Sequence, residues 1–563
     1  MRAAGIVNIN GKYSFMKGAF KLTMERRWQK WYDEGVPGTC YYPITTMKDE
    51  FIKWVRANPD KPYIYCNDQT YTYWETNQTA KKLANALLEL GVRRGDRVAL
   101  VLPNIPEFVF SSHAIMKIGA IIVPINPLYT IPEMVYNFND SGAETVIVFG
   151  PVVPKVLEIM RSGKTTLKRL IIMQVPGQET ALEEAPDIFN LADLIAGASD
   201  LEPDIHLDNK DTVILIYTGG TTGVPKGCCL TNSNFVAFYT VFIEWSKAMF
   251  PPQELRTLCT VPLYHIYGFN MQINANLSSG GTMILVPEVT PDNVLTAIDK
   301  YLPTYWPAVP ALIQMLNMHP RLPESKASSI RFLLSGSAPL PVEALRKFES
   351  ITGSTIIEGF GGSETTNGVM VNPKGKRKPG TVGIPFPDMD VKIVDIKNGT
   401  DEMTVNEPGE LILKGPLIIE KYWNNPEETA NAIRDGWFYT GDIATMDEDG
   451  YITIVGRTKD MINSSGFNIY PRDIDELLYT HPKVLDAGAI GVPDPIRGES
   501  VKVFVVLKPG ETMTEEEVIA FCRESLAAYK VPRYVEFLDD IPRTGMKKVD
   551  RKALREMEEN RSK

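Results

Sequence analysis

The sequence lacks the paired cysteines from which disulfide frameworks and zinc sites are built. Its six cysteines lie far apart or directly adjacent and never form a CxxC pair: Cys40, Cys66, Cys228, Cys229, Cys259 and Cys522. Disulfide-rich domains and structural zinc modules use regularly spaced cysteines. The pattern therefore predicts reduced thiols and no structural metal site.

Long hydrophobic runs are also missing. No window reaches the ~18 uninterrupted apolar residues of a membrane span, and residues 1–20 contain no apolar core of a signal peptide. His113 and Lys117 interrupt the apolar stretch 108–124, which we interpret as a buried helix and strand. We expect a cytoplasmic protein without a transmembrane segment, and weak association with a membrane surface stays open.

An excess of positive charge is absent as well. The chain has 69 acidic and 59 basic residues, a formal net charge of -10. This balance argues against a protein that coats nucleic acid or anionic membrane. We expect small-molecule partners, no nucleic acid, and a monomer or a homodimer.

What the sequence does contain is a regular alternation of helix and strand patterns. An amphipathic pattern runs from about Thr79 to Gly91, and an apolar strand (98–102), a second helix (105–118) and a second strand (120–124) follow it. Similar apolar strands recur at 145–149, 170–173, 213–217 and 330–334. This alternation is typical of layered α/β proteins with parallel sheets, and 563 residues exceed one ordinary core.

The pattern changes towards the C-terminus. Residues 381–455 consist of short strands and tight turns, and mixed elements return afterwards, with a helix at 471–480, a strand at 501–507, a helix at 514–526 and a basic tail. We predict an α/β protein whose large N-terminal domain (1–457) has layered, mostly parallel sheets and a small β unit at about 381–455. A small, mobile α+β C-terminal domain (458–563) completes the prediction.

One glycine-rich and threonine-rich segment stands out. Residues 216–229 read IYTGGTTGVPKGCC and follow an apolar strand. Exposed backbone N–H groups and hydroxyls can surround phosphate oxygens. The segment is not a Walker A loop, because Lys226 precedes glycine rather than serine or threonine. Taken alone, it fits a surface loop equally well.

A series of motifs removes this ambiguity. The segment 217–227 resembles the phosphate loop of the adenylate-forming superfamily, which includes acyl-CoA synthetases, peptide-synthetase adenylation domains and beetle luciferases. Further motifs follow in the order of that family: VPLYHIYG (261–268), SGSAPL (335–340), EGFGGSE (358–364), YTGD (439–442), GR (456–457) and PRTGMKKVDR (542–551). The resemblance covers residues 75–555. It implies ATP-dependent, AMP-forming ligation of a carboxylic acid to CoA through an acyl-adenylate, with Mg²⁺.

The resemblance also implies roles for individual residues. His265 lines the carboxylate pocket, Glu364 binds Mg²⁺, and Lys548 is the catalytic lysine. Asp442 binds the ribose, with Arg457 as its partner. The residues implied in ATP or AMP binding are Thr218, Gly219, Gly220, Thr221, Thr222, Gly223, Lys226, Ser337, Ala338, Pro339, Glu358, Gly359, Phe360, Ser363, Asp442 and Arg457.

A second group of residues belongs to the thioester-forming step and to the acyl pocket. Lys459 stands at the family's hinge, about which the small domain turns between the two half-reactions. The segment implied in CoA binding is Ser465, Gly466 and Phe467, and the acyl pocket is implied to contain His265, Phe269, Gly361 and Gly362, the two glycines leaving room for an extended chain.

Details of the motifs bear on the acid. At Gly219 and in the segment NPLYT (126–130), the sequence resembles long-chain and medium-chain fatty acyl-CoA ligases. Asn463 and Lys547 stand at positions where the family usually has lysine and glycine, respectively. We expect a fatty acid, with an aromatic or alicyclic acid as the alternative. Loading of a carrier protein and a non-catalytic nucleotide-binding homologue are the alternatives from other classes.

Overall fold

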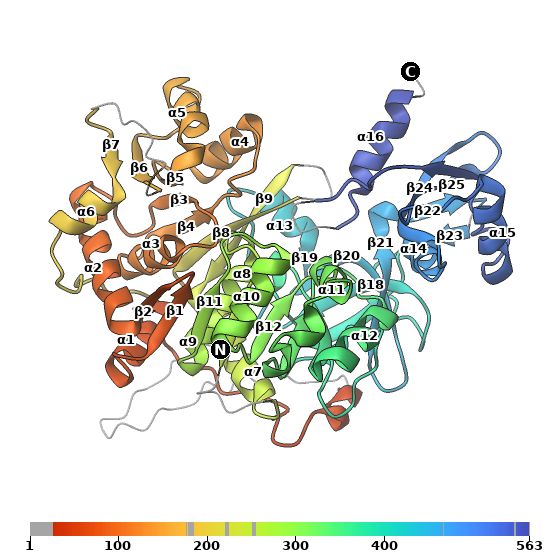
Figure 1. Cartoon of the computed structure of the whole chain (residues 1–563), viewed down its shortest axis with the longest axis horizontal. Coiled ribbons are helices and arrows are strands. Elements are labelled where there is room, and N and C mark those ends of the chain that lie inside the picture. The colour runs from red at the N-terminus through yellow and green to blue at the C-terminus, as the bar shows by residue number, and fades with distance from the viewer. Residues whose placement is uncertain are drawn as a thin grey trace.

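A computed structural model describes residues 26–175, 177, 185–219, 224–249, 255–465, 467–544 and 548–561. The described strands form four sheets (Figure 1). Two large sheets belong to the N-terminal part of the chain, a small antiparallel sheet follows them, and a fourth sheet lies in the C-terminal part. This is the mixed α/β fold that the sequence predicts.

The first large sheet has the strand order β7-β6-β5-β3-β4-β8-β9. All neighbours are parallel except β9, which pairs antiparallel with β8. The strands are β3 (Arg97–Val101), β4 (Ile121–Pro124), β5 (Thr145–Phe149), β6 (Arg169–Met173), β7 (Ile188–Asn190), β8 (Thr212–Gly219) and β9 (Pro225–Thr231), and the helices beside them are α4 (Ile131–Ser141), α5 (Val153–Arg161) and α6 (Leu191–Gly197). The strands predicted at 98–102, 120–124, 145–149, 170–173 and 213–217 are confirmed.

The second large sheet has the order β16-β15-β14-β13-β12-β10-β11-β1-β2 and is parallel from β14 to β1. Its strands are β1 (Pro62–Cys66), β2 (Gln69–Thr72), β10 (Arg256–Cys259), β11 (Thr282–Leu285), β12 (Tyr305–Ala308), β13 (Phe332–Ser335), β14 (Thr355–Phe360), β15 (Met370–Val371) and β16 (Ile384–Pro385). Helices α10 (Pro291–Tyr301), α11 (Pro310–Asn317) and α12 (Val342–Thr352) share an apolar core with these strands.

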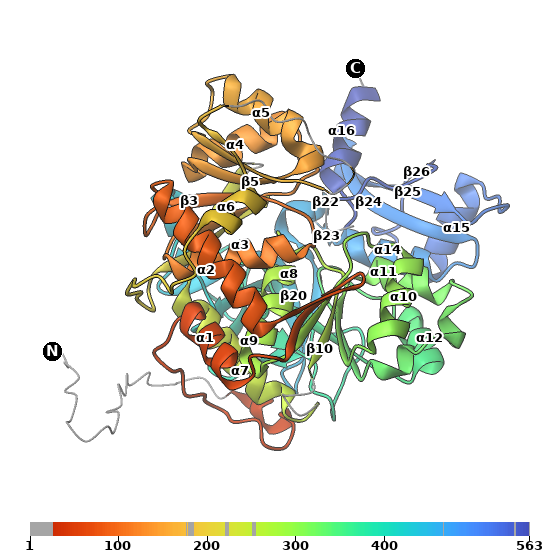
Figure 2. The same ribbon diagram turned by 60° about the vertical axis from the view of Figure 1, so that its left-hand side comes forward.

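Helices α1 (Met47–Ala57), α2 (Tyr73–Glu89) and α3 (Pro106–Lys117) pack side by side (Figure 2). Helix α3 is buried except for Glu107, and one apolar core joins these helices, α7 (Asn232–Ser246) and strands of both large sheets. Helix α2 begins at Tyr73 rather than at about Thr79, because Thr72 and Glu75 form a capping box. The apolar period alone could not locate this start.

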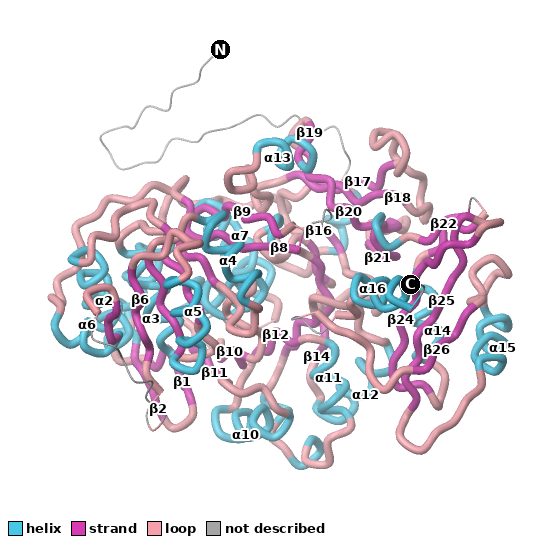
Figure 3. The backbone as a smooth tube through the Cα atoms, turned by 90° about the horizontal axis from the view of Figure 1, so that it is seen from above, coloured by secondary structure: helices cyan, strands magenta, loops and turns pink. Residues whose placement is uncertain are grey.

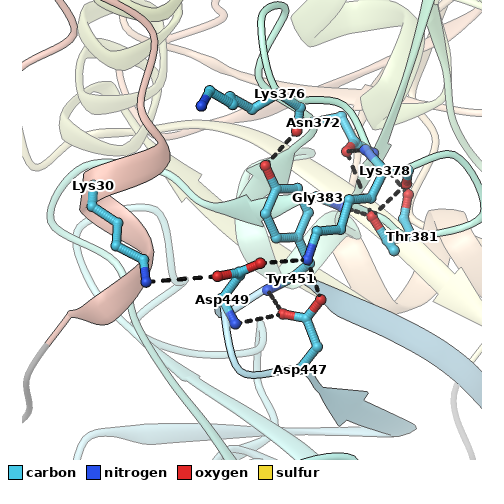
Figure 4. Close-up of polar contacts among 9 residues, drawn as sticks. All are labelled: Lys30, Asn372, Lys376, Lys378, Thr381, Gly383, Asp447, Asp449 and Tyr451. Carbon is cyan, nitrogen blue, oxygen red and sulfur yellow. Dashed lines mark hydrogen bonds and ion pairs between the residues drawn. The ribbon is translucent and has the colours of Figure 1, made fainter.

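The predicted small β unit is confirmed as an antiparallel sheet of β17 (Asp390–Val394), β18 (Gly409–Lys414), β19 (Ile433–Arg434), β20 (Trp437–Met446) and β21 (Ile452–Arg457), with α13 (Pro426–Ala432) before β19. An ion-pair cluster holds the β20–β21 turn (Figure 4). Lys378 Nζ lies 2.6 Å from Asp447 Oδ2 and 2.8 Å from Asp449 Oδ2. Lys30 Nζ, in η1 (Arg27–Trp31), lies 3.6 Å from Asp449 Oδ1. The cluster thereby anchors the hairpin that carries Asp442 and Arg457.

The C-terminal part contains β22 (Ile462–Ser464), β23 (Phe467–Ile469), β24 (Val484–Asp494), β25 (Gly498–Leu507), β26 (Tyr534–Phe537), α14 (Pro471–Tyr479), α15 (Glu515–Ser525) and α16 (Arg551–Arg561). The predicted helices and strand are confirmed, and the expected basic tail includes helix α16 beside β24 (Figure 3). This part has an apolar core of its own. The short helix η8 (Thr458–Asp460) connects it to β21.

The remaining short helices are η2 (Gly150–Val152), α8 (Ile266–Gly268), the π-helical segment η4 (Phe269–Asn274), α9 (Ala275–Ser279), η5 (Leu322–Glu324), η6 (Ala327–Ser329) and η7 (Ser363–Thr365). Within the described part of the chain, no helix has the length and apolarity needed to cross a membrane. All six cysteines are free thiols.

Candidate active site

The expected phosphate loop is the tip of the β8–β9 hairpin. Thr218 and Lys226 lie directly opposite each other in the ladder, with Gly219 opposite Pro225. The Thr218 hydroxyl is 3.5 Å from Glu364 Oε1, and the Lys226 side chain is only 8% exposed. Gly220, Thr221, Thr222 and Gly223 lie outside the described residues. The sequence predicts the strand before the loop but not its antiparallel return.

Glu364 lies in η7, next to this hairpin. Its Oε1 accepts a hydrogen bond from the Tyr422 hydroxyl at 3.0 Å. Among the described residues, no group of three or more His, Cys, Asp or Glu side chains could hold a metal. A single carboxylate still fits Mg²⁺, which binds through one or two carboxylates together with substrate phosphates and water.

Asp442 and Arg457 are brought together by strand pairing. They lie opposite each other on β20 and β21, and Arg457 Nε donates to Asp442 Oδ1 at 3.0 Å. Asp442 is buried, while the Arg457 side chain is half exposed. The pKa of Arg457 is raised chiefly by Asp442, and Glu364 adds to this effect. Glu364, beside the β8–β9 hairpin, and Asp442, on β20, are therefore both within electrostatic reach of Arg457.

Lys548, from the C-terminal part, joins this site. Burial lowers the pKa of Lys548 to about 8, Arg457 lowers it further, and Asp442 opposes the shift. Burial also lowers the pKa of His265 to about 3, with a contribution from the charge of Lys548. The fold thus places Lys548 within electrostatic reach of two segments distant in sequence.

His265 has a defined orientation. It precedes α8, and its Nδ1 accepts a hydrogen bond from the Tyr267 backbone N–H at 3.2 Å. The imidazole is neutral, so its proton lies on Nε2, which can donate to a carboxylate. Phe269 begins the π-helical segment and packs against Phe235 with ring centroids 5.5 Å apart. Such segments are frequent at functional sites.

The residues expected near adenine lie at the carboxyl ends of adjacent strands, where Ser335 of β13 pairs with Glu358 of β14. Ser337 has a left-handed backbone (φ 76°), and within the described chain its buried hydroxyl has no hydrogen-bond partner. Burial raises the pKa of Glu358 to about 7, while its Oε2 accepts from Gly380 N at 3.0 Å. Ala338, Pro339, Gly359, Phe360 and Ser363 belong to the same two strand ends and their loops.

Backbone packing requires a glycine at position 361. A Cβ at this position would lie 1.5 Å from the Asn367 carbonyl oxygen. A Cβ at Gly362 would meet only Glu364 Oε2, at 3.4 Å. The space that we expect these glycines to provide for an acyl chain stays a prediction.

The segment expected to bind CoA lies in the C-terminal part. Phe467 is 53% exposed and stacks on Tyr529 at 4.6 Å, and Ser465 has a left-handed backbone (φ 52°). Gly466 lies outside the described residues, as does Lys547. Lys459 in η8 is exposed, and its carbonyl lies 3.5 Å from Arg555 Nη2. Phe467 is thus exposed on the C-terminal part, whereas Lys548 lies within electrostatic reach of Arg457 and Asp442.

Two residues of this site were missed by sequence reasoning. Tyr422 contacts Glu364, and Glu428 forms an ion pair with Lys226. Both lie in the segment YWNNPEE (422–428), whose only local signal is a turn and a helix start at Asn425-Pro426. Their contacts depend on tertiary structure.

Comparisons with known proteins identify the family of the chain. Residues 51–423 match the AMP-binding enzyme family, and residues 473–548 match the AMP-binding enzyme C-terminal domain. The chain is 37% identical over 560 residues to a long-chain-fatty-acid–CoA ligase of Bacillus subtilis, covering 95% of this chain and 99% of that protein. It is 34% identical to a feruloyl-CoA synthase of an Amycolatopsis species, covering 88% and 96%.

A solved structure adds information on conformation. ATP-bound MatB from Rhodopseudomonas palustris superposes with a TM-score of 0.82 at 30% identity, covering 92% of this chain and 100% of that one. The apo form of MatB gives a TM-score of 0.72. The arrangement of this chain is thus more similar to the ATP-bound form. The chain belongs to the AMP-binding enzyme family and is an acid–thiol ligase, an AMP-forming acyl-CoA synthetase that uses ATP, CoA and Mg²⁺.

Proposed function

We propose that the acid is a medium-chain or long-chain fatty acid. The observation that carries this proposal is the 37% identity to a long-chain-fatty-acid–CoA ligase along almost the whole chain. The buried ring of Phe269 beyond His265 offers an apolar wall for an acyl chain. We further propose a cytoplasmic enzyme that works as a monomer or a homodimer.

In the first half-reaction, the carboxylate attacks the α-phosphorus of ATP and pyrophosphate leaves. His265 Nε2–H orients the carboxylate, and the ammonium of Lys548 offsets the negative charge that accumulates when two anions meet. Asp442 accepts hydrogen bonds from the ribose hydroxyls, while Thr218 and Lys226 bind the β- and γ-phosphates. Glu364 would hold Mg²⁺, which would supply charge neutralisation on the phosphate oxygens when bound.

In the second half-reaction, the thiol of CoA attacks the acyl-adenylate and AMP leaves. We assign residues 1–457 and 458–563 to two domains, the second of which rotates about Lys459. The rotation withdraws Lys548 and brings the segment from Ser465 to Phe467 to the site. The electrostatic reach of Lys548 to Arg457 and Asp442, together with the exposure of Phe467, supports this division of work.

A ring-containing acid is the second candidate, and the feruloyl-CoA synthase relative favours it. Tyr264 and Tyr267 flank His265 and could enclose a ring. The test measures CoA-dependent AMP release with aliphatic acids of 8 to 18 carbons, alicyclic acids and hydroxycinnamic acids. A kcat/KM maximum among the aliphatic acids supports the proposal, and a ring-acid maximum overturns it.

The same assay separates the alternatives from other classes. Acid-dependent pyrophosphate release without any CoA-thioester product would favour loading of a carrier protein. ATP binding without acid-dependent pyrophosphate release would favour a non-catalytic nucleotide-binding protein.

A further inference from the structure

Lys226 has an anionic partner inside the protein. Its ammonium forms an ion pair with the carboxylate of Glu428, in α13, and lies 5.3 Å from the centre of the Tyr422 ring. The Lys226 side chain is 8% exposed and that of Glu428 is 24% exposed. A half-buried pair of this kind is screened less by solvent than a surface pair.

The position of Glu428 is fixed by local hydrogen bonds. Its backbone N–H donates to Asn425 Oδ1 at 3.1 Å, which caps α13. The next residue, Thr429, accepts at Oγ1 from the Tyr422 backbone N–H at 3.0 Å. Helix α13 and Tyr422 therefore form one unit, and the Glu428 carboxylate is held beside the β8–β9 hairpin.

The same unit reaches the expected magnesium ligand. The Tyr422 hydroxyl donates to Glu364 Oε1 at 3.0 Å, while the Tyr422 ring contacts the ammonium of Lys226. Glu428, Lys226, Tyr422 and Glu364 thus form a continuous series of contacts along the β8–β9 hairpin.

We propose that Glu428 competes with the polyphosphate for Lys226 and thereby promotes release of pyrophosphate. This inference rests on the proposed function, because it takes Lys226 as a ligand of the β- and γ-phosphates. When nucleotide binds, Lys226 exchanges the carboxylate for phosphate oxygens. After the acyl-adenylate has formed, the Glu428 carboxylate repels the pyrophosphate anion and pairs with Lys226 again. Glu428 is a positioning residue that acts through Lys226.

The chain offers a matched control for this test. Glu427 is adjacent to Glu428 on α13 and is exposed. Product inhibition by pyrophosphate and the KM for ATP are measured for the full-length enzyme and for Glu428→Gln, Glu428→Asp and Glu427→Gln. Melting temperatures are recorded alongside, because a purely structural ion pair would change stability without tightening pyrophosphate binding.

Glu428→Gln is expected to lower the inhibition constant of pyrophosphate and the KM for ATP by about threefold to tenfold, the size expected for loss of one competing hydrogen bond of ordinary net strength. Glu428→Asp retains the charge and is expected to stay close to the parent enzyme, as is Glu427→Gln. An unchanged or increased inhibition constant in Glu428→Gln overturns the proposal, and so does an equal decrease in Glu427→Gln.

A double-mutant cycle with Lys226→Ala separates this inference from the proposed function. The effect of Glu428→Gln should vanish in the Lys226→Ala background, and its persistence there overturns the proposal. If Lys226→Ala alone leaves pyrophosphate inhibition unchanged, the proposed phosphate-binding role of Lys226 has failed instead, and the competition proposal fails with it.

Discussion

Arg457 donates a hydrogen bond to Asp442 at 3.0 Å across the β20–β21 ladder, and Arg457 is the last residue of β21. The expected ribose ligand is thus tied to the residue that precedes η8, where the chain enters its C-terminal part. The proposed ribose role of Asp442 would therefore connect nucleotide binding to the orientation of that part.

Replacement of Asp442 by alanine should weaken nucleotide binding strongly. A carboxylate that accepts two hydroxyl groups contributes charged hydrogen bonds of about 1.5–3 kcal/mol each, so the KM for ATP should rise by at least about 100-fold. Steady-state kinetics with saturating acid and CoA would measure this. Glu448→Gln, an exposed carboxylate on the β20–β21 turn, is the control and should leave KM unchanged. An equal KM in both variants would contradict the ribose assignment.

The adenylation rate should depend on pH through Lys548. With its pKa lowered to about 8, the lysine carries its charge below that pH and loses it above. The kcat/KM of the first half-reaction should therefore fall about tenfold per pH unit above pH 8. Lys548→Arg stays charged at every pH of the assay and should lack this decrease, although its rate is lower. The same decrease in the arginine variant would assign the titration to another group.

Glu364→Gln should reduce the apparent affinity for Mg²⁺, because the amide retains the shape of the carboxylate but loses its charge. Tyr422→Phe removes the hydroxyl that holds Glu364 Oε1 and should produce a weaker effect of the same kind. Removal of such supporting groups typically costs about 10-fold to 100-fold in metal affinity or activity. Activity titrated against free Mg²⁺ at constant ATP measures both, and an unchanged Mg²⁺ dependence in Glu364→Gln would exclude the metal role.

The sequence predicts the parallel strands of the first sheet because each is a short apolar run between polar turns. It misplaces the start of α2, since the capping box of Thr72 and Glu75 precedes the periodic segment. It also interprets the end of the chain as a basic tail, whereas α16 packs against β24. A highly charged helix with one buried leucine, Leu554, has too weak an apolar pattern to be recognised.

The candidate site could be predicted to the extent that it consists of contiguous motifs. Motif order predicted His265, Glu364, Asp442, Arg457 and Lys548, but apart from the pairing of Asp442 with Arg457 it gave no relation between them in space. The Glu428–Lys226 pair and the Tyr422–Glu364 hydrogen bond join residues far apart in the chain, and neither follows from local propensity. The backbone contact that requires glycine at position 361 was not predicted, because close approach of another backbone segment cannot be seen in a sequence.

Acid stability should depend on His113, which lies outside the candidate site. Its ring stacks on Phe51 at 3.8 Å, its Nε2 is 3.1 Å from the Tyr63 hydroxyl, and burial lowers its pKa to about 3. Between about pH 3 and 6.5 the unfolded chain binds a proton that the folded chain does not, so stability falls as pH falls through this range. The slope per group is about 1.4 kcal/mol per pH unit.

His113→Asn removes this titrating group. The melting temperature of the variant at pH 7 should be lower than that of the parent, but it should decrease less between pH 6.5 and 4.5. Differential scanning fluorimetry across this range measures both slopes. Parallel slopes would show that His113 takes up its proton at the same pH in the folded and in the unfolded enzyme, and would contradict the prediction.

The most direct test of the account compares the two half-reactions in Lys548→Ala. Acid-dependent exchange of pyrophosphate into ATP reports on adenylate formation, and thioester formation from a supplied acyl-adenylate and CoA reports on the second step. We predict that the variant loses at least about 100-fold in the exchange reaction, as removal of one transition-state charge implies, and retains thioester formation. An equal loss in both half-reactions would contradict the division of work between Lys548 and the segment from Ser465 to Phe467.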